Sequence, residues 1–376
     1  MANETTASYD GQDFLNGSAN GTTADGVFTL HRYKHGAGIT GLIIMAYALV
    51  FLLCVVGNVI VCGVVIKTPR LRTVTNYFIL NLAVSDLLVA IFCMPFTLVE
   101  HILTDYQFGD VMCRVNPMIQ GISVAASVYT MTAIAYDRYK AIVFPTEPRM
   151  SLTKMRYALA GIWISAVAVM VPQVFVLQVE TFYPTKTVSV NACIETWPDI
   201  VYKKTYTFML FSLVYVGPLA VISFFYCRIM CKLAMTPSSA VDDPQHASQF
   251  AVSKKRVRVL KMLITVVVLF ALCWLPLYTC WMLVDFARLS KQQMAVIHRY
   301  VYPVAHWLGY SNSCANPIVY GFFNTNIRNN LESMSIKRRL ENAKLQMPKR
   351  NVQRAEDQDD VKETIKMTPL AKSDRK

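Results

Sequence analysis

Seven long stretches of apolar, almost uncharged residues constrain this chain more than any other feature. Each has about 20 or more residues, the length that an α-helix needs to cross a bilayer. They lie at 40–66, 75–103, 111–142, 155–177, 206–233, 259–286 and 295–322. The strands of a membrane β-barrel would instead be about 10 residues long, with alternating polarity. The sequence therefore predicts an all-α fold, a bundle of seven transmembrane helices at 40–323.

The proportion of charged residues excludes several other classes of protein. Only 16% of the 376 residues are charged, whereas a soluble domain has about 25%. A soluble enzyme, a secreted disulfide scaffold and a disordered chain are therefore excluded. The net charge is +13, a basic balance that often indicates nucleic-acid binding. Here the positions of the charges along the chain explain it better.

The Lys and Arg residues are divided unequally between the two sides of the predicted membrane. Fifteen lie in or beside the loops after the first, third and fifth stretches, and seven lie in those after the second, fourth and sixth. Positively charged loops remain in the cytoplasm, where they meet anionic membrane lipid. We therefore expect a multi-pass plasma-membrane protein with an extracellular N-terminus, a cytoplasmic C-terminus and no nucleic-acid partner.

The polar segment at 1–39 agrees with an extracellular N-terminus. Its Asn-X-Ser/Thr sequons predict N-glycosylation at Asn3, Asn16 and Asn20. The segment begins with polar and acidic residues, so no cleavable signal peptide is expected. The first apolar stretch would then direct the chain to the membrane.

The cysteines predict one disulfide. Eight of the ten lie within the apolar stretches, where Cys is usually a small buried residue. The other two, Cys113 and Cys193, lie on the predicted outer side, where disulfides persist. We expect them to pair and to hold the second outer loop over the bundle. No spacing typical of metal ligands is present.

Three segments outside the apolar stretches have patterns of their own. Residues 234–253 are polar and contain Pro237 and Pro244, which predicts a flexible linker between two long helices. Residues 324–340 keep apolar side chains on one helical face, which is typical of an amphipathic helix on the inner membrane surface. The composition of residues 341–376 predicts a disordered cytoplasmic tail.

Polar residues and prolines inside the stretches indicate a functional bundle. Asp86 is the one acid in the middle of a stretch, and such a charge is costly and usually functional. It predicts a cation or proton site. Prolines kink membrane helices, which favours a bundle that can rearrange. The prolines concerned are Pro95, Pro172, Pro218, Pro276 and Pro317.

Short motifs on all seven stretches, taken in order, resemble those of the rhodopsin-like (class A) G-protein-coupled receptors. The resemblance covers about residues 40–340, through Gly57-Asn58, Leu82-Ala83-Val84-Ser85-Asp86, Cys113, Asp137-Arg138-Tyr139, Trp163, Pro218, Tyr226, Cys273-Trp274-Leu275-Pro276 and Asn316-Pro317-Ile318-Val319-Tyr320. The order and spacing of these motifs are specific. The resemblance implies a transducer that activates a heterotrimeric G protein and catalyses no reaction itself, with arrestin and receptor kinases as further partners.

The resemblance also implies roles for individual residues. Arg138 would be held by Asp137 in the inactive state and would turn toward the G protein on activation. The other residues of the implied activation switch are Tyr139, Trp274, Pro276, Tyr226, Pro317 and Tyr320. An allosteric Na⁺ pocket is implied at Asp86, Ser127, Asn312 and Asn316, and no other metal or cofactor is expected.

The residues implied for the ligand pocket point to an amidated peptide. Gln120 replaces the Asp of amine receptors, and residues 295–322 have no Lys to carry retinal. The pocket is similar to that of the neuropeptide Y and RFamide receptor groups, most of all the pyroglutamylated RFamide or neuropeptide FF branch. A carboxylate can pair with a peptide Arg, and Gln120 can bind a C-terminal amide. The implied ligand-binding residues are Gln120, Thr97, His306, Asp285, Glu195 and Trp274.

Other interpretations of the sequence stay open at this point. A class A receptor could bind a different ligand, such as a tachykinin-like peptide or a small molecule. A transporter should show repeat symmetry and more charges at the midplane, and a channel should show a ring of charges or a filter loop. Neither pattern is visible. An enzyme has little support, because the one mid-span carboxylate has no acid partner.

Overall fold

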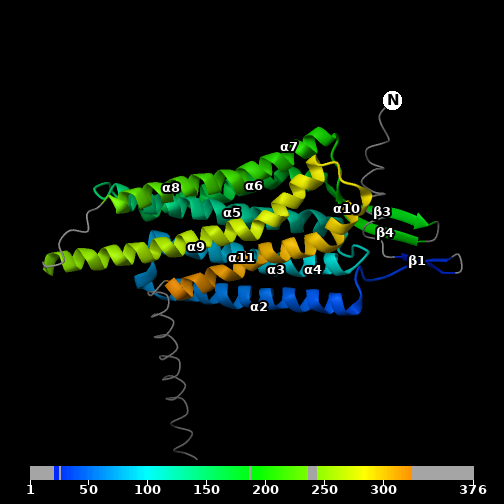
Figure 1. Cartoon of the computed structure of the whole chain (residues 1–376), viewed down its shortest axis with the longest axis horizontal. Helices are drawn as coiled ribbons and strands as arrows, with labels where there is room; N and C mark the ends of the chain where they lie inside the picture. Colours follow the sequence, from blue (N-terminus) through cyan, green and yellow to red (C-terminus); the bar gives the residue numbers. More distant parts are fainter. Residues whose placement is uncertain (1–20, 25–26, 186–187, 236–243, 324–376) are drawn as a thin grey trace, which may run out of the picture. The chain divides into compact units, whose positions relative to one another are not determined.

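The structure, a computed structural model, describes residues 21–24, 27–185, 188–235 and 244–323 (Figure 1). The helices are α2 (Ala37–Lys67), η1 (Pro69–Leu71), α3 (Val74–Phe92), α4 (Met94–Ile102), α5 (Gly109–Val143), α6 (Leu152–Val176), α7 (Ile200–Leu210), η2 (Phe211–Val216), α8 (Gly217–Ala234), α9 (Pro244–Phe286), α10 (Lys291–Val296), η3 (Ile297–Val301) and α11 (Tyr302–Phe323). The predicted glycosylation sites at Asn3, Asn16 and Asn20, the predicted surface helix at 324–340 and the predicted tail at 341–376 lie outside the described residues.

The described helices account for all seven apolar stretches. Six helical segments are long and apolar enough to cross a membrane: Ala37–Lys67, Val74–Ile102, Gly109–Val143, Leu152–Val176, Ile200–Ala234 and Val259–Phe286. The seventh stretch forms α10, η3 and α11, which follow one another directly along the chain. The prediction of a seven-helix bundle is therefore confirmed.

Polar residues next to the apolar stretches begin several of the helices. The Thr73 hydroxyl accepts from the amide of Asn76 at the start of α3, and Ser151 does the same for Lys154 at the start of α6. Such side-chain oxygens satisfy amides that have no partner within the helix. The second stretch is divided at Cys93, because α4 begins at Met94 with Pro95 in its first turn.

The start of α9 corrects one expectation from the sequence. The segment 234–253 was predicted to be a flexible linker, but α9 already begins at Pro244. Proline is well suited to the first turn of a helix, where its missing N–H is not needed. The following residues include Gln, Ala, Lys and Arg, which favour helix even outside the membrane. Pro244 therefore starts a helix where the sequence interpretation placed it in a linker.

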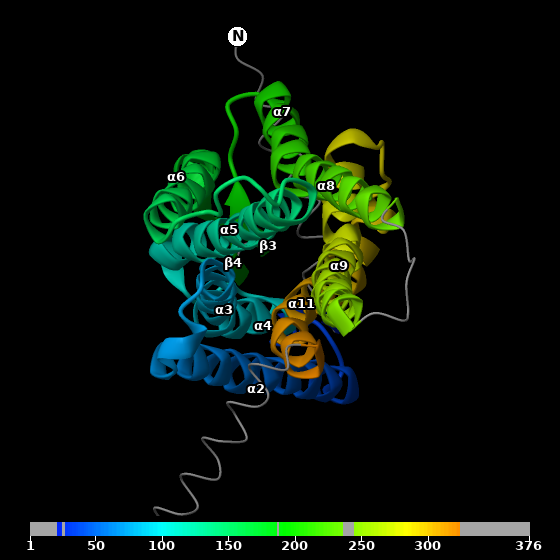
Figure 2. The ribbon, with the colours of Figure 1, turned by 90° about the vertical axis from the view of Figure 1, so that its left-hand side faces the viewer.

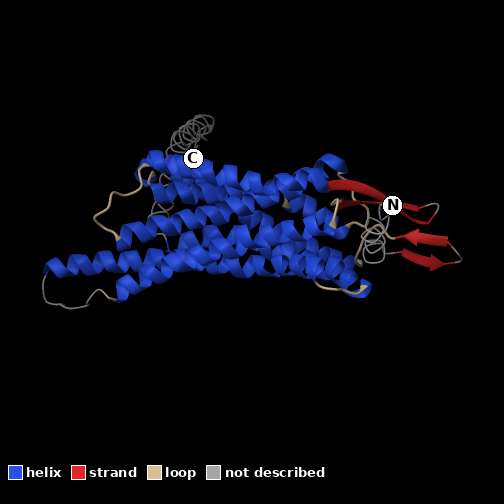
Figure 3. Cartoon of the chain, turned by 90° about the horizontal axis from the view of Figure 1, so that it is seen from above, coloured by secondary structure: helices blue, strands red, loops and turns tan. Residues whose placement is uncertain are grey.

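Two β-hairpins, which the sequence analysis did not predict, lie at one end of the described part of the chain (Figure 3). They are β1 (Gly21–Ala24) with β2 (Val27–Leu30), and β3 (Leu177–Thr185) with β4 (Val188–Glu195), each pair antiparallel. In the second hairpin Leu177 is opposite Glu195, and Val179 is opposite Cys193. This hairpin is most of the connection between α6 and α7.

The helices form a closed ring when they are viewed along their length (Figure 2). The helix α5 packs against α3, α6 and α8, and α11 packs against α9 and α2. Side-chain amides join these helices. Asn58 of α2 donates to the carbonyl of Ser313 on α11 at 3.0 Å. Asn81 of α3 donates to Thr130 on α5 at 2.8 Å and accepts from the indole of Trp163 on α6 at 2.9 Å.

Candidate functional site

The Cys113–Cys193 disulfide defines one end of the bundle. It joins the first turn of α5 to β4, with the two Cα atoms 5.5 Å apart. The predicted disulfide is therefore confirmed. We call this end of the bundle the disulfide end, and the end that carries Asp137-Arg138-Tyr139 the Arg138 end. The residues predicted to bind the ligand and those predicted to contact a G protein are described at these two ends in turn.

A hydrogen-bonded group of three buried residues joins α4, α5 and α11. The Tyr310 hydroxyl lies 2.8 Å from Thr97 Oγ1 and 2.8 Å from Gln120 Oε1. The Gln120 oxygen can only accept, so Tyr310 donates to Gln120 and accepts from Thr97. Two residues of the predicted ligand site, Gln120 and Thr97, are thus brought together through a third that was not predicted. The Gln120 amide NH₂ is left to donate elsewhere.

Two histidines lie beside this group. The His306 ring is centred 6.1 Å from the ring of Tyr310 and 5.0 Å from that of His101 on α4. His306 Nδ1 lies 3.0 Å from the carbonyl oxygen of Tyr302, one turn earlier in the same helical run. His101 Nε2 is buried and has no hydrogen-bond partner. The structure therefore places His306 next to Tyr310, and it adds His101 as an unsatisfied donor or acceptor.

Asp285 is buried near the end of α9 and is bonded to α7. Its carboxylate accepts from the Thr207 hydroxyl and forms an ion pair with Lys203, whose Nζ is 3.5 Å from Oδ1. The side chain of Asp285 is only 6% exposed, and that of Lys203 is 18% exposed. Asp285 is therefore a buried, paired carboxylate and not a solvated acid of a loop.

Glu195 is at the end of β4, two residues after the disulfide. It accepts from the Trp197 indole at 2.8 Å, and the Trp197 ring packs against Tyr206 of α7 with centroids 5.2 Å apart. This carboxylate is therefore held beside α7, the helix that also carries Lys203 and Thr207. Each of the two predicted acids is thus attached to the same side of the bundle.

Trp274 lies in the interior of α9 and is in close contact with α11. It is 2% exposed, and its indole N–H has no hydrogen-bond partner. A Cβ atom on Gly309 would lie 3.0 Å from the indole ring, so glycine is what allows this contact. Two residues farther on, Pro276 leaves the helix without one amide donor. The Tyr215 hydroxyl donates to the Ala271 carbonyl at 2.7 Å, which joins η2 to α9 one residue before Leu272, whose carbonyl loses its helical donor at Pro276.

The segment before α2 covers part of the disulfide end. The Lys34 amide donates to the carbonyl of Ile102, and its Nζ donates to the carbonyl of Glu100, both at 2.9 Å. Burial lowers the pKa of Lys34 and of His35, and the positive charge of Arg299 lowers both further. Neither side chain was singled out from the sequence. Both side chains at the edge of this end therefore hold their protons less tightly than they would in water.

The predicted Na⁺ pocket lies in the middle of the bundle. Asp86 is 1% exposed and accepts from the Asn316 amide at 2.9 Å. Among the described residues, no Lys, Arg or His is within ion-pair distance of it. The side-chain oxygens of Asn58, Asn312 and Asn316 are buried without hydrogen-bond partners. A buried carboxylate that is contacted by Asn316, whose amide oxygen is unpaired, suits a hard cation. Ser127 is also buried.

The Arg138 end carries several of the other predicted switch residues, and Pro276 lies farther along α9, toward the disulfide end. The Arg138 guanidinium donates to Asp137 Oδ2 at 2.5 Å and to the hydroxyl of Thr75 on α3. Tyr139 stacks near Phe225 of α8, with ring centroids 5.1 Å apart. Tyr226, Pro276, Pro317 and Tyr320 lie in α8, α9 and α11, and both tyrosines are buried. Arg138 is therefore fixed to α3 and to its own neighbour.

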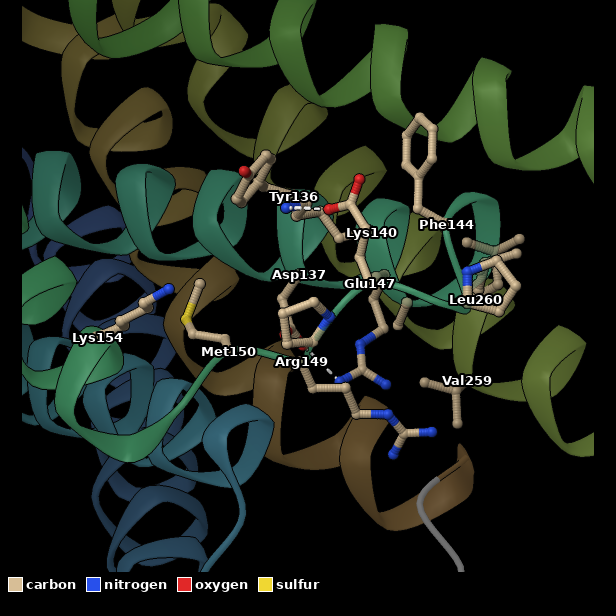
Figure 4. Close-up of a pocket in the computed structure, with 15 residues that line it drawn as sticks. Tyr136, Asp137, Lys140, Phe144, Glu147, Arg149, Met150, Lys154, Val259 and Leu260 are labelled. Atoms are coloured by element: carbon tan, nitrogen blue, oxygen red, sulfur yellow. Dashed lines mark hydrogen bonds and ion pairs between the residues drawn. The ribbon is translucent and has the colours of Figure 1, made fainter.

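A cavity of about 380 Å³ opens beside Arg138, between α5, the loop that follows it and α9 (Figure 4). Lys140 and Glu147 form an ion pair across this loop at 2.5 Å. Arg149 and Lys154 also line the cavity, with Val259 and Leu260 on the α9 side. The lining of the cavity is thus mostly apolar, and its four cationic side chains outnumber its two acidic ones, Asp137 and Glu147.

Four residues of these groups were missed from the sequence. Tyr310 and His101 follow two predicted residues, His306 and Thr97, by four positions in a helix, and Thr207 follows Lys203 by the same spacing. Residues four apart share a helix face, so this spacing was an available signal for Tyr310 and His101. Nothing in the sequence places Lys203 beside a residue that is 82 positions away.

Comparison with known proteins agrees with this architecture. The family described as "7 transmembrane receptor (rhodopsin family)" matches residues 57–320. The chain is 44% identical over 311 residues to neuropeptide FF receptor 2 of Rattus norvegicus, covering 81% of this chain and 74% of that one. It is 42% identical over 308 residues to neuropeptide FF receptor 1 of Homo sapiens, covering 80% and 71%.

A more distant relative is named for another peptide, RYamide. The RYamide receptor of Drosophila melanogaster is 34% identical over 290 residues, covering 76% of this chain and 61% of that one. These relatives belong to a family of receptors and not of enzymes. The match to the family spans more than half of the chain and includes every helix from α3 to α8, the motifs around Arg138 and Trp274, and the last motif at Tyr320. The chain belongs to the rhodopsin family of seven-transmembrane receptors.

Proposed function

We propose that this chain is a G-protein-coupled receptor for a neuropeptide that ends in Arg-Phe-amide. The observation that carries the proposal is a buried carboxylate, Asp285, together with a buried carboxamide, Gln120, in one receptor bundle. A peptide of this type has one group for each: a guanidinium and a terminal amide. The identity to two neuropeptide FF receptors supports the same ligand class.

The chemistry of these groups suggests how the peptide is recognised. Asp285 accepts two N–H bonds from the guanidinium of the peptide Arg in a bidentate pair. The Gln120 NH₂ donates to the oxygen of the terminal amide, while its own oxygen is held by Tyr310. His306 and Thr97 line the same region, and Glu195 offers a second carboxylate. Trp274 contacts the part of the ligand that reaches farthest into the bundle.

The orientation of the chain follows from the charge distribution and the disulfide. The disulfide end faces the extracellular side of the plasma membrane, where disulfides persist. The Arg138 end faces the cytoplasm, with its surplus of Lys and Arg near anionic lipid. Peptide binding at one end then changes the population of states at the other, because the two sites are linked through one bundle.

At the cytoplasmic end, the pairing of Arg138 controls the response. In the described arrangement Arg138 is bonded to Asp137 and Thr75, which suits an inactive state. Activation frees Arg138 to face the G protein, as Tyr226 and Tyr320 move inward and α9 bends near Pro276. The cavity beside Arg138, with apolar and mostly cationic charged residues in its lining, gives this partner room to enter. Arrestin and receptor kinases would act on the same cytoplasmic face.

The Asp86 region supports an allosteric Na⁺ site. The carboxylate of Asp86, the side-chain oxygens of Asn312 and Asn316 and the hydroxyl of Ser127 would hold the ion, which would supply the positive charge that the described residues lack there. Because Na⁺ binding would favour the inactive state, it would lower agonist affinity by linkage.

Replacement of Asp86 by Asn tests the Na⁺ site. In the wild-type chain, agonist affinity should fall as NaCl replaces choline chloride at constant ionic strength. Asp86→Asn removes the charge that attracts the ion, so affinity should become independent of this exchange. Competition binding on membranes measures both, with Asp199→Asn as a control that changes an exposed acid whose capping of α7 an Asn can keep. A sodium effect that survives in Asp86→Asn would place the ion elsewhere.

The ligand class is tested by one comparison. Cells that express the chain are challenged with a peptide that ends in Arg-Phe-amide and with the same peptide as a free acid, and calcium and cyclic AMP are recorded. Gln120 is suited to a neutral amide, whereas a carboxylate would meet the carboxylates of Asp285 and Glu195 nearby. We expect a response to the amide at concentrations at least about tenfold lower than to the acid.

Silence toward both peptides, with the chain detected at the cell surface, would contradict the RFamide proposal. Tachykinin-like peptides and small molecules are then the next class to test, because the family would remain unchanged. Equal potency of the two forms would show that a terminal amide is not recognised, and it would remove the role proposed for Gln120.

A further inference from the structure

The environment of Asp285 shows what a peptide arginine would have to replace. Its Oδ1 atom is paired with Lys203 and its Oδ2 atom accepts from Thr207, so both oxygens are already engaged. Lys203 and Thr207 are four residues apart on α7 and therefore share a helix face. The two residues join α7 to the end of α9 at the disulfide end.

The pairing with Lys203 is important because the carboxylate of Asp285 is buried. A carboxylate that is 6% exposed would be costly without a positive charge or donors beside it. Lys203 provides that charge while no ligand is present. A guanidinium that binds the same two oxygens bidentately needs the position of the ammonium, and two cations at this distance from each other repel. Lys203 and a ligand arginine therefore exclude one another.

We propose that Lys203 is an internal competitor for the peptide, and that its bond to Asp285 must open before the arginine of the ligand can pair there. We call the bonded group of Lys203, Thr207 and Asp285 the α7–α9 latch. The proposal rests on the function proposed above, and it adds a residue that sets the affinity for the ligand. A site that is open for only part of the time binds with an apparent affinity reduced by that fraction.

Two substitutions of Lys203 should change peptide affinity in opposite directions. Lys203→Gln removes the competing charge, so an RFamide peptide should bind about three- to tenfold more tightly. Lys203→Arg keeps the charge but can pair with Asp285 bidentately, so the same peptide should bind about three- to tenfold more weakly. A purely long-range effect of charge would leave Lys203→Arg unchanged.

The neighbouring lysine gives a matched control. Lys204 has the same charge and lies one residue farther along α7. Its Nζ lies 5.8 Å from the ring centroid of Phe286, whereas the ion pair with Asp285 is made by Lys203. Lys204→Gln should therefore leave affinity within about twofold of the wild type. In an Asp285→Asn background, Lys203→Gln should no longer increase affinity, because position 285 then has no carboxylate for which Lys203 and the peptide arginine could compete.

A measurement without ligand tests the latch independently of the peptide. The full chain is purified in detergent, and melting temperatures are compared for the wild type, Lys203→Gln, Asp285→Asn and the double variant. If the pair exists, the losses in melting temperature are not additive, because either single change already breaks the bond. Additive losses would overturn the latch.

The two experiments separate the two proposals. Wild-type binding of the peptide with no shift in either Lys203 variant would overturn the competitor role and leave the proposed function standing. No binding by the wild type, with clear coupling in the melting temperatures, would reject the RFamide ligand and retain the α7–α9 latch as a structural pair. Opposite shifts in Lys203→Gln and Lys203→Arg, absent from Lys204→Gln, would support the competitor role.

Discussion

Asp285→Asn is expected to weaken binding of a peptide that ends in Arg-Phe-amide at least about tenfold. The substitution preserves the shape of the side chain but removes the negative charge that the peptide arginine needs. Competition binding on membranes, corrected for the amount of receptor at the surface, measures the effect.

A matched acid and a matched peptide make this prediction specific. Glu180 lies on β3 at the same end of the bundle, and Glu180→Gln should leave affinity nearly unchanged. A peptide with citrulline in place of arginine has no positive charge, so it should bind weakly to the wild type and lose little more with Asp285→Asn. Equal losses for the arginine and citrulline peptides would show that Asp285 stabilises the fold and does not pair with the ligand.

Loss of the Cys113–Cys193 bond is expected to abolish most peptide binding at the cell surface. Native disulfides typically contribute about 2–5 kcal/mol to the free energy of unfolding. Here the bond fixes β4 to α5 and so determines where Glu195 lies. Hydrogen bonds also hold the hairpin: Asp105 accepts from the Asn191 amide at 2.6 Å, and Asp110 accepts from the Val179 amide at 3.1 Å. These bonds should keep part of the hairpin formed.

The test compares Cys113→Ser, Cys193→Ser and the double variant. Both single variants should lose binding to the same degree, and the double variant should lose no more than either, because each removes one shared bond. Cys227→Ser is the control, because Cys227 is a free, exposed cysteine on α8. Normal peptide affinity in both single variants would show that the hydrogen bonds of the hairpin suffice to position Glu195.

The sequence predicted those parts of the fold that depend on local composition. Apolar stretches of membrane length gave all seven helical segments, and the position of two cysteines on one predicted side gave the disulfide. The β3–β4 hairpin was missed, although Val188, Val190 and Ala192 alternate with polar residues as a strand requires. That signal is short, and it lies between two strong helical ones.

The sequence predicted which residues form the candidate site, but not the contacts between them. Gln120, Thr97, Asp285 and His306 came from a resemblance of motifs, which gives positions in a sequence and no contacts. The partners of these residues depend on how separate helices pack. Tyr310 reaches Thr97 and Gln120 across 213 and 190 positions of the chain. No rule of local spacing contains such a pairing, and the same holds for Lys203 and Asp285.

The π-helical segment η2 at Phe211–Val216 lies between α7 and α8, within the membrane-length helical segment Ile200–Ala234. It changes the direction in which the side chains of α7 face relative to those of α8. A π turn takes up one more residue than an α turn, which rotates everything before it by about 100° relative to an unbroken α-helix. Lys203 and Thr207 lie before this turn, and Tyr226 lies after it. The half of this helix at the disulfide end can therefore gain or lose a residue and present a new face there, while the half at the Arg138 end keeps its register. Ligand preference can diverge in evolution without disturbing the transmission of the signal.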